Sequence, residues 1–259
     1  MITRKLILGV IAALPMVFVA NLASGAEPDD YDRALTVVGR DAQDRARDER
    51  DKPAEVLRFA GVTRGMVVAD VFGGGGYYAQ LLATLVGPEG QVLLINNAPY
   101  AEFVADDLKR RFADGRLSEV DRRVVKNEDL TLPAGKVDLV LIVMSYHDLY
   151  YSGDGWPAID AGQFLEQIKT ALKPGGAFVI VDHAARAGSG KSDAQTLHRI
   201  DEDFAVRDIE SHGFVLEDRY TGLRNNEDAR DKSVFDPSIR GHSDRFVHRY
   251  RKPAAANNE

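Results

Sequence analysis

Apolar residues occur along the chain in two alternating patterns, as short unbroken runs and as positions at helical spacing. The run from Val137 to Met144 is interrupted only by Asp138, which is typical of a parallel strand covered on both faces. Between residues 161 and 172 the apolar side chains recur at helical spacing, which predicts an amphipathic helix. Further runs predict strands at 66–71, 91–95, 120–125, 177–181, 214–220 and 245–250.

Helices are expected between these strands, at 54–60, 77–86, 102–112, 161–172 and 202–211. In the helix at 102–112, Phe103 is expected to face the core. The last strand, 245–250, alternates apolar and polar residues, which indicates an edge or antiparallel strand. Strands and helices that alternate at this spacing predict an α/β domain, with a mostly parallel sheet and helices on both faces.

The first 26 residues differ from the rest of the chain. Arg4 and Lys5 precede an apolar stretch at 6–20, and small residues follow at 24–26. This order predicts a secretory signal peptide, cleaved after residue 26, and therefore a periplasmic or secreted protein with no membrane contact after cleavage. An uncleaved membrane anchor is the alternative, which Pro15 and the small residues disfavour.

The remaining chain divides into three parts by composition. Residues 27–52 are highly charged and predict a polar N-terminal arm, either a solvated extension or, less favoured, a lid over a ligand. Residues 53–252 carry the strand and helix pattern and predict one domain. Residues 253–259 are expected to form a disordered tail. Within the domain, the polar connection at 221–243 is long enough to be functional or disordered.

Charge and cysteine content exclude several classes of function. Without residues 1–26, the 33 basic residues fall to 31 against 40 acidic ones, which leaves a net charge of −9. Nucleic acid is therefore not an expected partner, because phosphate binding relies on clustered Lys and Arg. The chain has no cysteine. Disulfides, thiolate nucleophiles and cysteine-ligated metals are excluded as a result.

Four consecutive glycines, residues 73–76, lie between the strand at 66–71 and the helix at 77–86. A glycine turn between a strand and a helix lets a nucleotide-like ligand lie against the backbone at the helix N-terminus. Ordinary tight turns also use glycine, so this signal alone is weak. A nicotinamide enzyme would place an acidic residue about 20 positions further on. That position holds Asn96, which disfavours such an oxidoreductase.

Several segments, in their order along the chain, resemble the class I methyltransferases that depend on S-adenosylmethionine (SAM). They are VADVFGGGG (68–76), EDLTLP (128–133), VDLV (137–140) and LKPGG (172–176). Other segments resemble a bacterial group of predicted methyltransferases that often carry signal peptides. These are VDHAA (181–185), LHRID (197–201), VFDP (234–237), IRG (239–241) and DRF (244–246). The likeness covers about residues 50–252, and the order of the segments is more specific than any one of them.

The resemblance implies a Rossmann-like methyltransferase sandwich, with a seven-stranded, mostly parallel sheet whose last strand is antiparallel. It implies SAM as cofactor, with the glycines forming the cofactor turn, Asn96 at the ribose, and Asn127 or Glu128 beside the adenine. The implied cofactor-binding residues are Asp70, Gly73, Gly74, Gly76, Asn96, Asn127 and Glu128. Two positions depart from the usual pattern of the family: Phe72 replaces a glycine, and Asn96 replaces an acidic residue.

His147 and Asp148, which follow the central strand, are the candidate catalytic residues. Methyl transfer to oxygen or nitrogen often requires removal of a proton, and a neutral histidine suits that role. The alternative is a loop histidine that only caps backbone groups. Aromatic residues follow in the same loop, including Tyr151 and Trp156, and these can pack against a ligand or against the 221–243 segment.

A divalent metal is a less favoured possibility, and no metal ligands are assigned. His147, His183 and His198 lie on adjoining segments with nearby aspartates, and such groups can hold an ion. More simply, Asp182 and His183 orient backbone turns, and Arg199 pairs with a carboxylate. His248 is expected at the surface.

Two functions remain open after these observations. The first is SAM-dependent methyl transfer to a small-molecule acceptor by an exported enzyme. The second is a non-catalytic exported binding protein that uses the same scaffold with an altered pocket, as Phe72 and Asn96 indicate. The sequence predicts no oligomeric state.

Overall fold

The computed structural model describes residues 28–153 and 155–254. The expected signal peptide, 1–26, and most of the expected tail, 255–259, lie outside the described residues.

The core of the molecule is one seven-stranded sheet, as the sequence predicts. Its strands follow the spatial order β3 (Val120–Val125), β2 (Gln91–Asn97), β1 (Val67–Val71), β4 (Val137–Val143), β5 (Leu172–His183), β7 (Arg245–Arg251) and β6 (Val215–Tyr220). β7 runs antiparallel to both of its neighbours, β5 and β6. The expected antiparallel last strand is confirmed, and the edge strand on that side is β6 rather than β7.

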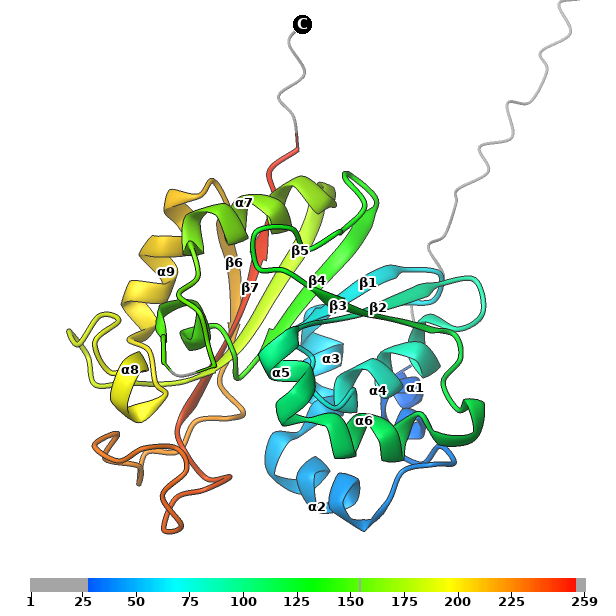
Figure 1. Ribbon diagram of the computed structural model, residues 1–259, viewed down its shortest axis with the longest axis horizontal. Helices are drawn as coiled ribbons and strands as arrows, with labels where there is room; N and C mark the ends of the chain where they lie inside the picture. Colours follow the sequence, from blue (N-terminus) through cyan, green and yellow to red (C-terminus); the bar gives the residue numbers. More distant parts are fainter. Residues whose placement is uncertain (1–27, 154, 255–259) are drawn as a thin grey trace, which may run out of the picture.

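Helices cover both faces of the sheet, because successive residues of the central strands point to opposite sides. In β1, Val68 belongs to the hydrophobic cluster under α1 (Pro28–Ala34), α3 (Pro53–Ala60) and α4 (Tyr77–Val86). The next residue, Ala69, belongs to the cluster under α7 (Ala161–Ala171) and α9 (Glu202–Ser211). Figure 1 shows these two groups of helices on opposite sides of the sheet. The result is the expected three-layer α/β sandwich.

The helix expected at 102–112 is two helices, α5 (Ala98–Phe103) and α6 (Ala105–Arg111). The Asn97 side chain accepts a hydrogen bond from the backbone N–H of Tyr100, and Pro99 lies in the first turn. Both features start a helix directly after β2. The expectation that Phe103 is buried is wrong, since its side chain is 81% exposed at the end of α5.

The N-terminal arm packs on the domain through α2 (Ala42–Asp51). Arg111 of α6 donates two hydrogen bonds to Asp44, at 2.6 and 2.9 Å, and both side chains are buried. At the other end of α2, Arg245 of β7 donates to Asp51 at 2.6 Å. Two buried, hydrogen-bonded ion pairs therefore fix α2 between the glycine-turn side of the sheet and β7.

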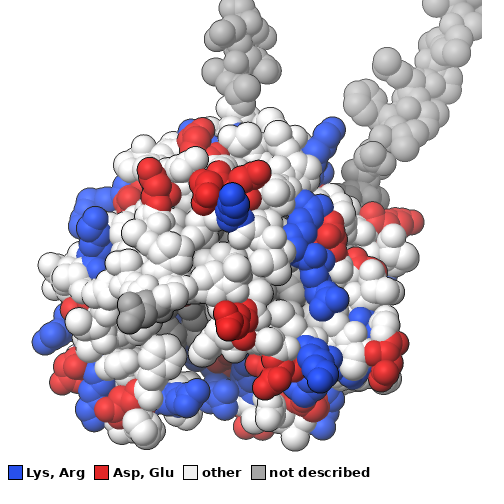
Figure 2. Space-filling view, in the orientation of Figure 1, with Lys and Arg blue, Asp and Glu red and all other residues white. Residues whose placement is uncertain are grey.

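On the face drawn in Figure 2, basic side chains are dispersed among acidic ones.

Over the described residues, no helix is both long and apolar enough to cross a membrane. Three short helical segments remain among the described residues. α8 (Ala194–Leu197) is a single α-helical turn, and η1 (Ala113–Gly115) and η2 (His147–Tyr150) are 3-10 helices.

Glu202, the first residue of α9, connects that helix to β7 and to the long polar loop. It accepts a hydrogen bond from His248 Nε2 at 2.9 Å and pairs with Arg224, while Arg219 of β6 lies 3.9 Å away. His248 is buried, so the expectation that it lies at the surface is wrong. Burial alone would raise the pKa of Glu202, but the hydrogen bonds from His248 and Arg224 lower it to about 2.

Glu202→Gln is expected to flatten the acid side of the curve of stability against pH. The folded-state pKa of Glu202 is lower than its ordinary 4.5, so its contribution is present above pH 4.5 and is lost as pH falls towards 2. We expect the native protein to lose about 1–2 kcal/mol more than the variant over this range, allowing for partial solvent exposure. Urea unfolding at stepped pH measures this difference. Glu119→Gln, at an exposed position, is the control and should match the parent.

Candidate active site

One large cavity lies at the carboxyl ends of the parallel strands, with a volume of about 1010 Å³. Its walls come from α2, from the glycine turn, from α5 and α6, from the loop after β4, and from the 221–243 segment. Figure 1 shows α2 and the 221–243 loop at the same lower end of the molecule. Ligands of open α/β sheets bind at this end of the strands.

The glycine turn after β1 has no room for side chains at two of its positions. A Cβ at Gly73 would lie 2.4 Å from the Asp70 carboxyl group, and one at Gly75 would lie 2.6 Å from Asp107 Cβ. Gly74 and Gly76 have φ angles of 57° and 80°, which favour glycine. Of the residues in this turn, Gly75 lines the cavity. The turn therefore presents backbone to the cavity, as a cofactor turn requires.

Asp70, directly below this turn, is a buried carboxylate with an unusual charge state. It does not line the cavity, and no side chain of the described residues hydrogen-bonds to its oxygens. Burial raises its pKa to about 7, against the opposing effects of the Arg47 charge and of a hydrogen bond from the backbone of Ala79. A buried carboxylate with no side-chain partner is costly, so this group indicates a missing cationic or hydrogen-bond-donating partner.

Asn96 lies beside the turn, but it makes a different contact from the one the resemblance implies. Its Oδ1 accepts from the Gly74 N–H at 3.0 Å, and its Nδ2 donates to the Gly74 carbonyl at 2.9 Å. The Asn96 side-chain amide therefore stabilises the turn through two hydrogen bonds to the backbone of Gly74. Asn127 accepts from Asn97 at 3.1 Å, and Glu128 is exposed. None of Asn96, Asn127 and Glu128 lines the cavity, and their contacts with ribose and adenine stay predictions.

Phe72 occupies the first position of the turn with a φ of 53°, and its ring is buried. The ring packs against Phe164 of α7 at 5.2 Å and against Tyr100 and Trp156 at 5.9 and 5.8 Å. It thus points into the core under α7 and does not line the cavity. Tyr100 does line the cavity, and its hydroxyl contacts Ser145 Oγ at 3.2 Å.

Tyr100 also covers the turn at Gly74. A Cβ at Gly74 would lie 3.7 Å from the Tyr100 hydroxyl oxygen. Burial raises the pKa of Tyr100 to about 12, so the side chain is neutral at physiological pH. A neutral aromatic ring therefore separates this corner of the turn from the rest of the cavity.

His147 is held by Asp182, a fully buried residue at the end of β5. His147 Nδ1 lies 2.7 Å from Asp182 Oδ1, and the backbone N–H of His147 donates to Asp182 Oδ2 at 2.7 Å. Asp182 also accepts the backbone N–H of His183, so it orients both chain segments, as the sequence indicated. On the other side of the ring, His147 Nε2 lies 3.3 Å from Asp148 Oδ1.

The negative charges around His147 favour its protonated form. Burial alone would lower the pKa of His147, but the negative charges of Asp182 and Asp148 raise it to about 9. The imidazole is therefore protonated at neutral pH and cannot accept another proton. Asp148 is half-buried and lines the cavity beside it, so the two residues form one acid–base pair.

His183 and His198, the other histidines of the possible metal set, also reach this cavity. His183 Nδ1 contacts Ser243 Oγ at 2.7 Å, and burial, together with the charge of His147, lowers its pKa well below the usual value. His198 packs between Tyr151 and Phe235, at ring distances of 4.8 and 4.9 Å. Its Nδ1 lies 3.9 Å from Asp148 Oδ1.

The 221–243 loop has no helix or strand, yet it is anchored by ion pairs with buried carboxylates. Arg199 is fully buried and pairs with Asp228 at 2.8 Å, which confirms that it has a carboxylate partner. Arg230 pairs with Asp244 at 2.7 Å. These contacts hold Phe235 and the other loop residues at the wall of the cavity.

Comparisons with known proteins agree with the fold. A family model described as a methyltransferase domain matches residues 62–225. The chain belongs to this methyltransferase domain family. A search of the curated proteins finds no match.

Solved structures of similar fold include several SAM-dependent methyltransferases. One from Aquifex aeolicus is 19% identical, with a TM-score of 0.59, and the match covers 87% of this chain and 98% of that one. A phosphoethanolamine N-methyltransferase from Haemonchus contortus, in complex with SAM, is 14% identical with a TM-score of 0.54, over 78% of this chain and 52% of that one. The [4+2]-cyclase SpnF is 18% identical with a TM-score of 0.58, over 87% and 94%. The fold is thus that of the SAM-dependent methyltransferases.

Asn96→Ala is expected to destabilise the protein by about 1–3 kcal/mol, because it leaves the buried N–H and C=O of Gly74 without partners. Chemical denaturation measures this loss. Asn226→Ala, at an exposed position, is the matched control and should change stability by less than about 0.5 kcal/mol. Equal stability of the two variants would show that Asn96 does not brace the turn.

Proposed function

We propose that this protein transfers the methyl group of SAM to a small-molecule acceptor. The observation that carries the proposal is the single cavity that reaches both Gly75 of the glycine turn and the His147–Asp148 pair. Its volume of about 1010 Å³ lies at the upper end of small-molecule pockets and accommodates a donor together with a small acceptor.

The residues present fit the amino-acid end of SAM. The turn offers backbone at Gly75, and the Asp70 carboxylate below it has no side-chain partner. The ammonium group of SAM would supply positive charge at this corner. Asn96 contributes by holding Gly74 in place, rather than by a contact of its own. When bound, SAM supplies a sulfonium methyl group that an acceptor oxygen or nitrogen can attack.

The acceptor is proposed to lie on the His147 side of the cavity. In methyl transfer the acceptor forms a bond to the methyl carbon, the carbon–sulfur bond breaks, and the acceptor loses its proton. Because His147 already carries both of its protons, Asp148 is the group of the pair that accepts this one. Asp182 acts as a positioning residue that fixes the His147 ring.

Export of the enzyme is part of the proposal, and a non-catalytic exported binding protein is its alternative. Residues 1–26 have the composition of a signal peptide, and fractionation of cells for the mature chain tests whether the protein is exported.

Two contacts favour the alternative of a binding protein: the Asn96 side chain is hydrogen-bonded to Gly74, and Tyr100 covers that corner of the turn. One fold can host different activities, so only measurement of SAM binding and transfer separates the two.

Calorimetry with SAM tests the donor site, and Asp70→Asn is the decisive variant. Replacement of a buried carboxylate that has no side-chain partner by an amide should leave stability unchanged or higher, while removal of the negative charge should weaken SAM binding about tenfold or more. Asp231→Asn, which is exposed, is the control. Failure of the parent protein to bind SAM at millimolar concentration would support the binding-protein alternative.

The affinity for SAM is also expected to rise with pH near neutrality. The pKa of Asp70 is about 7, and its ionised form attracts the ammonium group, so binding should strengthen as the pH rises from about 5.5 to 7, below the range of about 7.7–8.0 in which an α-amino group ordinarily loses its charge. Arg47 faces Asp70 and stays charged, while the raised pKa values of Tyr78 and Tyr100 keep them neutral. Calorimetry of the Asp70→Asn variant should show a flat profile over the same range.

A further inference from the structure

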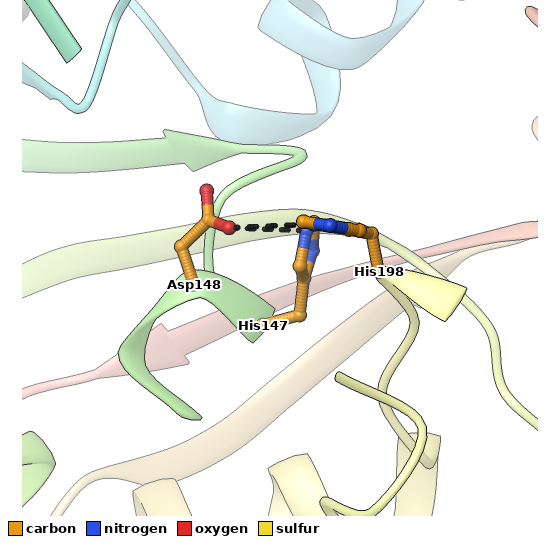
Figure 3. A group of neighbouring side chains, drawn as sticks. All are labelled: His147, Asp148 and His198. Atoms are coloured by element: carbon orange, nitrogen blue, oxygen red, sulfur yellow. Dashed lines mark ion pairs between the residues drawn. The ribbon is translucent and has the colours of Figure 1, made fainter. Parts of the chain in front are cut away.

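Three side chains outside the glycine turn converge on one point of the cavity wall. His147, Asp148 and His198 each offer a ligand atom, and these three atoms lie within 4.8 Å of one another. Figure 3 shows the Asp148 carboxylate pointing towards the two imidazole rings, which come from η2 and from the residue after α8. All three residues line the cavity.

The contact with Asp182 selects the nitrogen of His147 that faces this point. His147 Nδ1 is bonded to Asp182 at 2.7 Å, which leaves Nε2 directed towards Asp148. A carboxylate that binds the far nitrogen of a histidine is the usual companion of a metal-ligating imidazole. The carboxylates of Asp148 and Asp182 lie beside the two histidines, and their two negative charges would balance the charge of a divalent cation.

Neighbouring aromatic rings and the local backbone hold the His198 side chain in place. Its ring packs between Tyr151 and Phe235, and its backbone has a φ of 53°, which is uncommon for a residue with a side chain. Backbone strain of this kind concentrates at functional sites. His198 is thus held with Nδ1 facing Asp148 at 3.9 Å.

The separations match those of ligand atoms around a single ion. With metal–ligand bonds of about 2.0–2.2 Å, two ligand atoms of a tetrahedral site lie roughly 3.3–3.6 Å apart. Asp148 Oδ1 lies 3.3 Å from His147 Nε2 and 3.9 Å from His198 Nδ1, and all three ligand atoms lie within 4.8 Å of one another. Small side-chain movements towards the ion would close the site.

We propose that His147 Nε2, His198 Nδ1 and Asp148 bind one divalent transition-metal ion, with its remaining coordination positions open to the cavity. Two imidazoles and one carboxylate favour ions such as Zn²⁺, Co²⁺ or Fe²⁺ over Mg²⁺ and Ca²⁺, which prefer oxygen ligands. Binding of the ion would displace the proton from His147 Nε2 and would occupy Asp148. In the metal-bound form the ion, in place of Asp148, would then promote proton loss by lowering the pKa of an acceptor hydroxyl in the same cavity as the donor turn. That last consequence rests on the proposed function, whereas the ion site itself does not.

Metal binding to the mature chain, with no SAM present, tests the site. Calorimetry with Zn²⁺ should show one ion per chain with a micromolar or lower Kd, and Mg²⁺ should bind at least a hundredfold more weakly. Co²⁺ should give a visible absorption spectrum typical of mixed nitrogen and oxygen ligands. His198→Ala should weaken Zn²⁺ binding at least tenfold, and Asp148→Asn, which keeps the side-chain shape, should do the same.

His242→Ala is the matched control, because His242 is exposed on the 221–243 loop and does not line the cavity. It should bind Zn²⁺ as the parent does. The proposal is overturned if the parent binds neither Zn²⁺ nor Co²⁺ below millimolar concentration, or if folded His198→Ala and Asp148→Asn both keep the parent affinity. Failure of SAM binding alone would leave this measurement unaffected, so the two proposals fail separately.

Discussion

The arrangement of the site depends on one buried carboxylate, Asp182. It lies at the end of β5 with 0% exposure, and it accepts hydrogen bonds from the backbone of His147 and of His183. A buried carboxylate must be satisfied in this way, and the requirement ties the loop after β4 to the end of β5. The same group fixes the His147 ring, so the orientation of the candidate catalytic pair follows from how Asp182 is paired.

The positions of most strands and helices could be predicted from the sequence, because the sheet is buried on both faces. Continuous apolar runs such as 137–144 and periodic segments such as 161–172 report burial directly. The break between α5 and α6 could not be found in this way. A local cap at Asn97 and the adjacent Pro99 start α5 at Ala98, ahead of the apolar spacing of 102–112, and the break at Val104 has no side-chain cap to mark it.

The candidate site was predictable in its location and less so in its contacts. Strand ends placed the glycine turn and His147 correctly at one edge of the sheet. Side-chain partners come from distant parts of the chain, and sequence spacing carries no information about them. Asn96 pairs with Gly74, the charges around His147 keep it protonated, and His198 meets Asp148 through packing by Phe235. The one local signal for His198 was its place among the LHRID residues.

The ion pair between Asp51 and Arg245 has a consequence for how the chain can be divided. It joins a helix near the start of the described chain to the last strand, 194 positions later. A shortened chain that begins at residue 53 would retain every strand of the sheet, but Arg245 would be left without its carboxylate and the cavity without one of its walls. Such a fragment would also lose Tyr31 and Ala34 from the hydrophobic core and the Asp44 partner of Arg111, so it would be a poor guide to what the intact protein binds.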